Sequence, residues 1–178
     1  MNIIVSFSGR RDGNCDTIAK YISSKEDLVL FMREISTQPC ADCDYECMSG
    51  QCKYHGDGIY AFFEKCALAD KIFFIVPMYC GNPSSLYFIM NERCQEYFMQ
   101  NESHWEKMLK KLYMIGIYGS EENDPDFLNC FARQYPFKNV EKHILGLERH
   151  KYNQKINDFL LDVDEVKVKL NEFISGQD

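Results

Sequence analysis

No apolar run in this sequence is long enough to cross a membrane. A membrane-spanning helix needs about 20 predominantly apolar residues, whereas the most apolar stretch, residues 72–76, has the length of a strand. The first residues, Met1–Val5, also lack the basic region and the cleavage site of a signal peptide. We therefore expect no membrane partner and a cytoplasmic location.

The sequence also lacks an excess of positive charge. Its 20 Lys and Arg residues are outnumbered by 27 Asp and Glu residues, which gives a formal net charge of -7. An electrostatic field of that sign opposes broad binding to nucleic acids and to anionic membranes. We therefore expect no nucleic-acid partner, and a phosphate-bearing ligand would have to be held by a local pocket.

Disulfide bonds, internal repeats and linkers are further features that we do not expect. Nine cysteines in a chain without an export signal indicate a reducing compartment, where thiols or a metal centre take the place of disulfides. A chain of 178 residues with no repeat, low-complexity tract or linker fits one domain with a sizeable core. The sequence therefore predicts a single domain over residues 1–178, with a cysteine-rich insertion at about 39–53.

What the sequence does contain is an alternation of strand-like and helix-like segments. Five apolar segments predict strands, and a helical pattern follows each of them. The expected strands are residues 3–7, 28–32, 72–76, 112–118 and 143–147, and the expected helices are residues 15–23, 59–69, 86–97, 127–135 and 156–173. This alternation predicts an α/β fold, a doubly wound five-stranded parallel sheet with helices on both faces. Right-handed crossovers favour the flavodoxin-like strand order 2-1-3-4-5.

Ligands bind such sheets beyond the carboxyl ends of the strands, where this chain has a polar loop at residues 8–17. The loop combines hydroxyls, two arginines and glycines with the start of a helix. Backbone N–H groups and the helix dipole favour an anion there, and arginine adds charge-assisted bonds to phosphate. The alternative is that Asn14 merely caps the helix. The loop is neither a Walker loop nor a dinucleotide-binding fingerprint, because Gly-Lys-Ser/Thr and three spaced glycines are missing.

A second loop, residues 77–84, follows the most apolar strand. Tyr79 offers a flat ring, Gly81 lets the backbone approach a ligand closely, and Asn82 carries a donor and an acceptor. These properties suit a planar heterocycle with hydrogen-bonding edges. The alternative is an ordinary loop in which Asn82 or Ser84 caps the next helix. The sequence shows no convincing nucleophile–base pair beside these loops.

Three motifs resemble the NAD(P)H-dependent FMN reductase family of the flavodoxin-like superfamily. SGRRDGNCDT is similar to the family's phosphate loop S-P-R-x-x-G-N-T, PCADCDYECMSGQC to its P-C-x-x-C-x-x-C-x-x-x-G-x-C segment, and PMYCGNPSS to its P-x-Y-x-G-N-x-S loop. The motifs occur in the family's order within residues 1–94. The chain departs from the pattern at Gly9, where the family has proline, and at Cys15, where it has a hydroxyl residue.

The resemblance implies a bound FMN whose phosphate is held by the first loop and whose ring is lined by the second. Gly119 and Ser120, after the fourth expected strand, would form a third wall. The implied cofactor-binding residues are Ser8, Arg10, Gly13, Asn14, Cys15, Asp16, Thr17, Pro77, Met78, Tyr79, Cys80, Gly81, Asn82, Gly119 and Ser120. The flavin carries the hydride or the electrons in such proteins, so no catalytic side chain is required.

The resemblance further implies an NAD(P)H-dependent oxidoreductase that reduces a small-molecule or protein electron acceptor and forms a dimer or a tetramer. Two alternatives remain open at this point. One is an electron carrier resembling the iron–sulfur flavoproteins, and the other is a flavodoxin-like binding module without enzymatic activity.

The cysteine-rich insertion bears on the first alternative. Its four cysteines have the spacing C-x₂-C-x₃-C-x₄-C and are Cys40, Cys43, Cys47 and Cys52. Compact runs of four cysteines can ligate a [4Fe–4S] cluster, and iron–sulfur flavoproteins carry a related motif with one residue fewer between the second and third cysteines. Zinc fits less well, because structural zinc sites usually pair two knuckles across a longer gap. We favour the hypothesis that these residues are reduced thiols that shape a loop beside the flavin.

Overall fold

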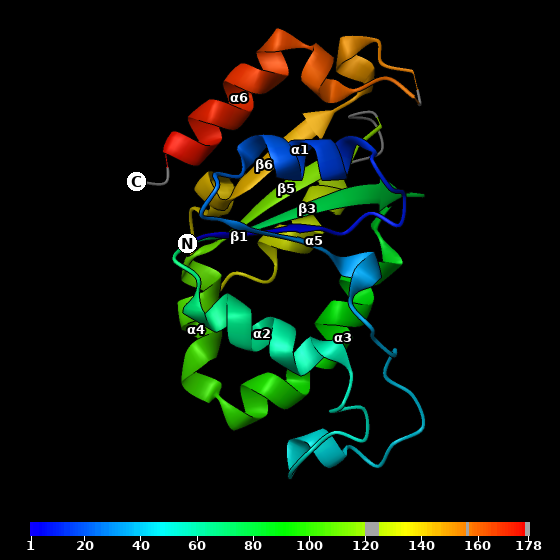
Figure 1. Cartoon of the computed structure of the whole chain (residues 1–178), viewed down its shortest axis with the longest axis vertical. Helices are drawn as coiled ribbons and strands as arrows, with labels where there is room; N and C mark the ends of the chain where they lie inside the picture. The colour runs from blue at the N-terminus through cyan, green and yellow to red at the C-terminus, as the bar shows by residue number, and fades with distance from the viewer. Residues whose placement is uncertain (120–124, 156, 177–178) are drawn as a thin grey trace.

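A parallel sheet lies between two layers of helices in the computed structural model of the protein, which describes residues 1–119, 125–155 and 157–176 (Figure 1). The strands are β1 (Ile3–Ser6), β2 (Leu28–Phe31), β3 (Ile72–Tyr79), β4 (Asn82–Pro83), β5 (Leu112–Tyr118) and β6 (Ile144–Glu148). The α-helices are α1 (Asn14–Ile22), α2 (Gly58–Leu68), α3 (Ser85–Gln100), α4 (Glu102–Lys110), α5 (Pro125–Ala132) and α6 (Asp164–Ser175). Short 3₁₀ helices include η1 (Met32–Glu34), η2 (Glu46–Met48) and η6 (Leu160–Asp162).

The strands follow the order β2-β1-β3-β5-β6, and every neighbouring pair along this path is parallel. β4 lies off the path and pairs with the end of β3 in an antiparallel hairpin. Without β4 this is the order 2-1-3-4-5, so the predicted flavodoxin-like topology is confirmed. The chain adds β2 on one side of β1 and then β3 on the other side. The carboxyl ends of β1 and β3 are therefore the topological switch point of the sheet.

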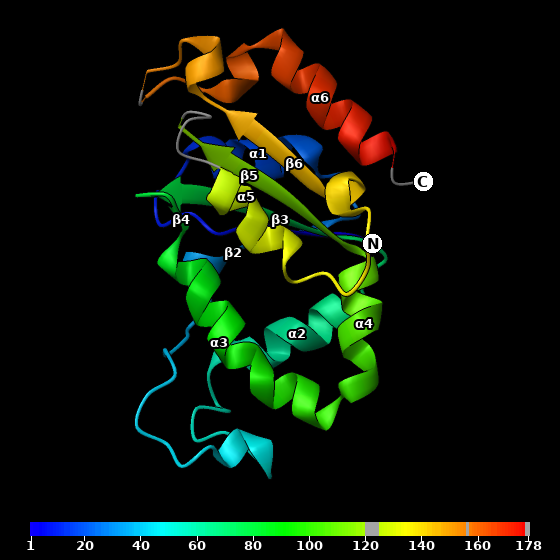
Figure 2. The same ribbon diagram turned by 180° about the vertical axis from the view of Figure 1, so that it is seen from behind.

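Alternating side chains of β1 and β3 enter two separate apolar clusters. Ile4 and Ile75 face α1 and α6, whereas Ile3, Phe7 and Phe74 face α2 and α3. Figures 1 and 2 show α1 and α6 on one face of the sheet and α2 to α5 on the other. A strand covered on both faces must be apolar at consecutive positions, which is why residues 72–76 have no polar side chain.

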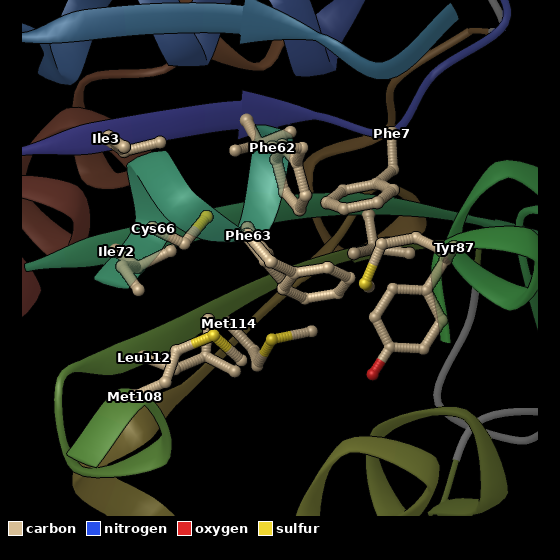
Figure 3. Packing of buried hydrophobic residues seen from close by; sticks show 14 of the residues in the cluster. Ile3, Phe7, Phe62, Phe63, Cys66, Ile72, Tyr87, Met108, Leu112 and Met114 are labelled. Carbon is tan, nitrogen blue, oxygen red and sulfur yellow. The ribbon is translucent and has the colours of Figure 1, made fainter. Parts of the chain in front are cut away.

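Aromatic rings fill the larger cluster (Figure 3). The ring of Phe7 packs edge-on against Phe74, with centroids 4.9 Å apart, and against Tyr87, with centroids 5.6 Å apart. Phe62 and Phe63 of α2 close the same cluster from the helical side. This packing holds α2 and α3 against one face of the sheet.

The helices differ from the sequence prediction in two places. The helix expected over residues 86–97 is α3, but α4 was not predicted; it follows α3 after a break at Asn101. The last helix starts at Asp164 and not at residue 156, because residues 160–162 form the 3₁₀ helix η6. Residue 156 itself lies outside the described residues. None of the helices described is both long and apolar enough to cross a bilayer.

Two glycines allow α5 to approach the sheet closely. Gly116 of β5 and Gly146 of β6 are paired in register. A Cβ at Gly116 would lie 2.8 Å from the side chains of both Leu128 and Phe127, and a Cβ at Gly146 would lie 2.9 Å from Leu128. Because these two glycines have no side chains, α5 can pack directly against the sheet at this position.

We expect Gly116→Ala to lower the free energy of unfolding by about 1–3 kcal/mol, because the added methyl group would clash with Leu128 and Phe127 of α5. Gly56→Ala is the control, since a Cβ at that exposed glycine meets no atom within 4 Å. Urea unfolding of both variants measures the difference. Equal stability of the two variants would show that α5 is not held against the glycine pair.

Candidate functional site

A cavity of about 420 Å³ opens at the carboxyl ends of β1, β3 and β5. Its volume lies within the usual range of small-molecule sites, and its position is the one where doubly wound sheets bind ligands. Its described lining consists of Ser8, Arg10, Gly13, Asn14, Cys15, Pro77, Met78, Tyr79, Ile117, Tyr118, Gly119 and Arg149. The structure thus brings together residues from the two polar loops and from the third wall. Ile117, Tyr118 and Arg149 also line the cavity and were not among the expected cofactor-binding residues.

The polar end of the cavity is the N-terminus of α1. Gly13 is the N-cap residue, and among the described side chains none caps this helix. Helix N-termini carry N–H groups without intrahelical partners and a partial positive charge. Ser8 and Arg10 line the same end, and the Ser8 hydroxyl accepts a hydrogen bond from the Arg10 backbone N–H at 3.1 Å. This end therefore offers backbone, hydroxyl and guanidinium donors to an anion.

Cys15 contributes no negative charge to this polar end. Its side chain is buried, and burial, with a smaller effect from Asp16, raises the pKa of the Cys15 thiol. The thiol is therefore neutral at physiological pH. The replacement of a hydroxyl residue by cysteine removes a donor, but it does not add a charge that would repel an anion.

Asn14 has a role that the sequence analysis did not anticipate. Its side-chain N–H donates to the carbonyl of Asp158 at 3.1 Å, and its side-chain oxygen accepts from the N–H of Leu160 at 2.7 Å. The amide thus fastens the segment before α6 to the first loop, in place of capping α1. Because the side chain is engaged in these bonds, the backbone N–H of Asn14 is the group that it can offer to a ligand at the helix N-terminus.

Two residues that the resemblance placed at the phosphate lie outside the lining described above. Asp16 is fully buried behind the loop, where its carboxylate is bound to Ser6, Asp12 and Arg33. The hydroxyl of Thr17 donates to backbone carbonyls of the preceding turn. These contacts stabilise the loop and do not point a group into the cavity.

The apolar end is formed by a β-hairpin. Tyr79 pairs with Asn82 across a two-residue turn in which Cys80 has φ 50° and Gly81 has φ 79°. Two successive positive φ angles are typical of a type I′ turn, whose twist suits a hairpin. Pro77, Met78 and Tyr79 line the cavity, with Tyr79 half exposed at its mouth.

The other residues of this loop have structural contacts. Cys80, Gly81 and Asn82 form the turn itself and lie outside the described lining of the cavity. The side-chain N–H of Asn82 donates to the carbonyl of Cys80 at 3.0 Å. The amide predicted to meet a heterocycle therefore closes the turn.

Arg149 comes from the segment just after β6. Its backbone N–H donates to the carbonyl of Tyr118 at 3.0 Å, which extends the β5–β6 pairing and brings the side chain to the cavity beside Gly119. The Nε of Arg149 is buried and has no hydrogen-bond partner among the described residues. Another nitrogen of the same guanidinium donates to the carbonyl of Lys155, which holds the side chain in place beside the cavity. The position of Arg149 just after the fifth predicted strand is the sequence signal that could have identified it.

Ser120, which was predicted to form this wall together with Gly119, lies outside the described residues.

The cysteine-rich segment packs against the middle of α3 and not at the cavity. The backbone N–H of Cys40 donates to Glu92, and that of Cys52 donates to Glu96, which also contacts His55. Both views show the segment on the opposite side of the sheet from α1 (Figures 1 and 2).

The four cysteines of this segment are free thiols. Burial raises the pKa of the Cys40 and Cys47 thiols, which favours their protonated forms. Within residues 1–119, 125–155 and 157–176, no three His, Cys, Asp or Glu side chains are grouped so that they could hold a metal ion. The proposed cluster set of Cys40, Cys43, Cys47 and Cys52 is therefore not assembled in this structure.

Comparisons with known proteins support the fold. No family model matches the sequence, and no curated protein matches it. The Trp repressor binding protein from Bacillus subtilis has a similar structure, with a TM-score of 0.63 at 13% identity over 96% of this chain and 97% of that chain. FerB from Paracoccus denitrificans, a flavoenzyme NAD(P)H:(acceptor) oxidoreductase, has a TM-score of 0.54 at 9% identity over 99% of this chain and 94% of that chain. At these identities the likeness shows that the chain has the flavodoxin-like fold.

The hairpin makes a testable prediction. Cys80 adopts a left-handed conformation that residues other than Gly, Asn and Asp rarely adopt. We expect Cys80→Asn to raise the free energy of unfolding by about 0.5–1 kcal/mol, because asparagine is favoured in type I′ turns. Cys80→Ala is the matched control, which removes the thiol without that preference. A Cys80→Asn variant no more stable than Cys80→Ala in urea unfolding would contradict the assigned turn.

Proposed function

We propose that this protein is an FMN-dependent oxidoreductase that takes electrons from NAD(P)H and passes them to a small-molecule or protein acceptor. One observation carries the proposal: the uncapped N-terminus of α1 opens into the same cavity as the hairpin residues Pro77, Met78 and Tyr79. FMN has an anionic phosphate at one end and a planar ring system at the other. A cavity with an anion-binding end and an aromatic end fits both parts of that molecule.

The polar end fits a terminal phosphate. Ser8 and Arg10 would bind phosphate oxygens with their side chains, and Gly13, Asn14 and Cys15 with backbone N–H groups. These donors have to act against a protein whose net charge is -7. Hydrogen bonds to charged groups contribute about 1.5–3 kcal/mol each, so a few of them suffice to hold a phosphate against this repulsion. The neutral thiol of Cys15 leaves their effect undiminished.

The apolar end fits the isoalloxazine ring. Pro77, Met78 and Tyr79 offer apolar and aromatic surface, and Arg149 at the same cavity brings a positive charge near the ring. A bound flavin supplies the hydride and electron chemistry. The side chains of the cavity bind the ring, orient it and exclude water from its inner face. Because the cofactor carries the reaction, the proposal needs no nucleophile or general base.

The half-exposed ring of Tyr79 at the mouth of the cavity favours a second planar ligand there. The nicotinamide ring of NAD(P)H would bind at this open side. FerB, whose fold is similar, is described as an NAD(P)H:(acceptor) oxidoreductase, which supports the same class of reaction here. The alternative of an iron–sulfur electron carrier has no comparable support, because the cysteine segment lies against α3 and its thiols are not grouped to hold a metal.

Binding of FMN and of riboflavin tests the proposal through Arg10. We expect the protein to bind FMN more tightly than riboflavin, which lacks the phosphate. Arg10→Ala should weaken FMN binding by about 1.5–3 kcal/mol, or about 10- to 150-fold in Kd, because a charge-assisted hydrogen bond is lost. Equilibrium titration followed by flavin fluorescence measures both constants.

Arg11→Ala is the matched control for this experiment. Arg11 is the neighbouring arginine, but its side chain is exposed and pairs with Glu34 at 3.0 Å. Its removal should leave the Kd for FMN unchanged. Equal affinities for FMN and riboflavin in the unmodified protein, or equal effects of Arg10→Ala and Arg11→Ala, would contradict the phosphate site.

Steady-state kinetics test the use of one site by both substrates. The sequence contains no second nucleotide fingerprint, so NAD(P)H and the acceptor should bind in turn beside Tyr79. We therefore expect parallel lines in double-reciprocal plots, the pattern of a ping-pong mechanism. Intersecting lines would contradict the shared site. An FMN-loaded protein that reacts with neither NADH nor NADPH would instead be an electron carrier without a nicotinamide substrate.

A further inference from the structure

A buried negative charge lies directly behind the proposed phosphate site. Asp16 belongs to the first turn of α1, and its side chain is fully buried. Asn14 and Cys15 of the same turn line the cavity, and N–H groups of a first helical turn have no intrahelical partner. An uncompensated carboxylate in this helical turn would oppose the binding of a phosphate, because like charges in a poorly solvated region repel strongly.

Arg33 compensates this charge. Its two terminal nitrogens bind the two carboxylate oxygens of Asp16 at 2.9 and 2.8 Å, which is a bidentate ion pair. The Arg33 side chain is 12% exposed, and its guanidinium stacks over Phe31, 4.6 Å from the ring centroid. The hydrogen bond with Asp16 raises the pKa of Arg33, which keeps the guanidinium charged.

The pair also holds the two ends of the loop that carries Arg10. Arg33 donates to the backbone carbonyl of Ser8 at 3.3 Å. The carboxylate of Asp16 accepts from the backbone N–H of Asp12 at 2.8 Å. Asp12 has φ 51°, a conformation that an isolated aspartate rarely adopts. The ion pair thus fixes residues 8–12 in the form that places Arg10 at the cavity.

The geometry points to Asp16 and Arg33 as a positioning pair that determines the preference of this site for a phosphorylated flavin. Arg33 balances the carboxylate behind the helix N-terminus, and the pair together preforms the loop. Neither side chain lines the cavity, so both act through the backbone of residues 8–15 and through their charge. This inference rests on the proposed function and adds to it the residues that make the site selective for the phosphate.

Three variants separate the charge of Arg33 from its shape. Arg33→Gln removes the charge and keeps hydrogen-bonding groups, Arg33→Lys keeps the charge, and Asp16→Asn combined with Arg33→Gln removes both charges. The measured quantity is the Kd of riboflavin divided by the Kd of FMN, which isolates the contribution of the phosphate. A general loss of structure would weaken both ligands and leave this ratio unchanged.

We expect Arg33→Gln to lower the ratio at least about 10-fold, because it leaves the carboxylate of Asp16 uncompensated behind the phosphate. The ratios of Arg33→Lys and of the double variant should stay within about threefold of the unmodified protein, since charge is balanced in both. Riboflavin affinity should change little in all three. Arg11→Gln serves as the surface control.

The outcomes distinguish this inference from the proposed function. An unmodified protein that binds FMN and riboflavin equally overturns the phosphate site itself. A protein that prefers FMN and keeps that preference in Arg33→Gln overturns the positioning pair and leaves the proposed function standing. Should Arg33→Gln fail to fold, the double variant decides: a preserved ratio supports charge compensation, and a loss of about 10-fold or more overturns it.

Discussion

Parallel pairing of β1, β3 and β5 brings three loops from distant parts of the sequence to one edge of the sheet. Ser6, the last residue of β1, lies beside Ile75 in register, and Pro77 lies beside Ile117, so β3 and β5 extend together past the end of β1 at the same edge of the sheet. The first of these loops starts a helix, the second turns back as a hairpin, and the third leads to Gly119. The anion-binding end and the aromatic end of the cavity are adjacent because of this register.

A second constraint acts within the first loop. A helix N-terminus attracts an anion only where its surroundings do not repel one. This chain buries a carboxylate in that helical turn and pairs it with an arginine that follows β2. The pairing of β2 with β1 therefore matters to the site although β2 contributes no residue to the described lining of the cavity. In this way an edge strand influences the chemistry at the switch point.

The sequence predicted those parts of the molecule that depend on local pattern. The consecutive apolar residues of β3 and the helical period after each strand led to the correct sheet order, because burial on two faces imposes those patterns. The hairpin escaped prediction because Cys80 occupies a turn position usually filled by asparagine or glycine. The break before α4 depends on the non-helical backbone conformation of Asn101, which the hydrophobic periodicity of the sequence does not indicate.

The site was predictable only at the level of loops. The helix N-terminus and the Tyr79 loop followed from the motifs, but the partners of individual side chains did not. Asn14 binds residues 158 and 160, and Asp16 binds Arg33, through contacts that no local pattern indicates. Arg149 reaches the cavity through strand pairing that is likewise distant in sequence.

One measurement tests the central claim most directly: a crystal structure of the protein grown with FMN. The account predicts FMN in the cavity, with its phosphate at the backbone N–H groups of Asn14 and Cys15 and its ring between the Tyr79 hairpin and Tyr118. A structure in which these loops keep their conformation while FMN is absent from the cavity, or lies elsewhere on the protein, would contradict the account.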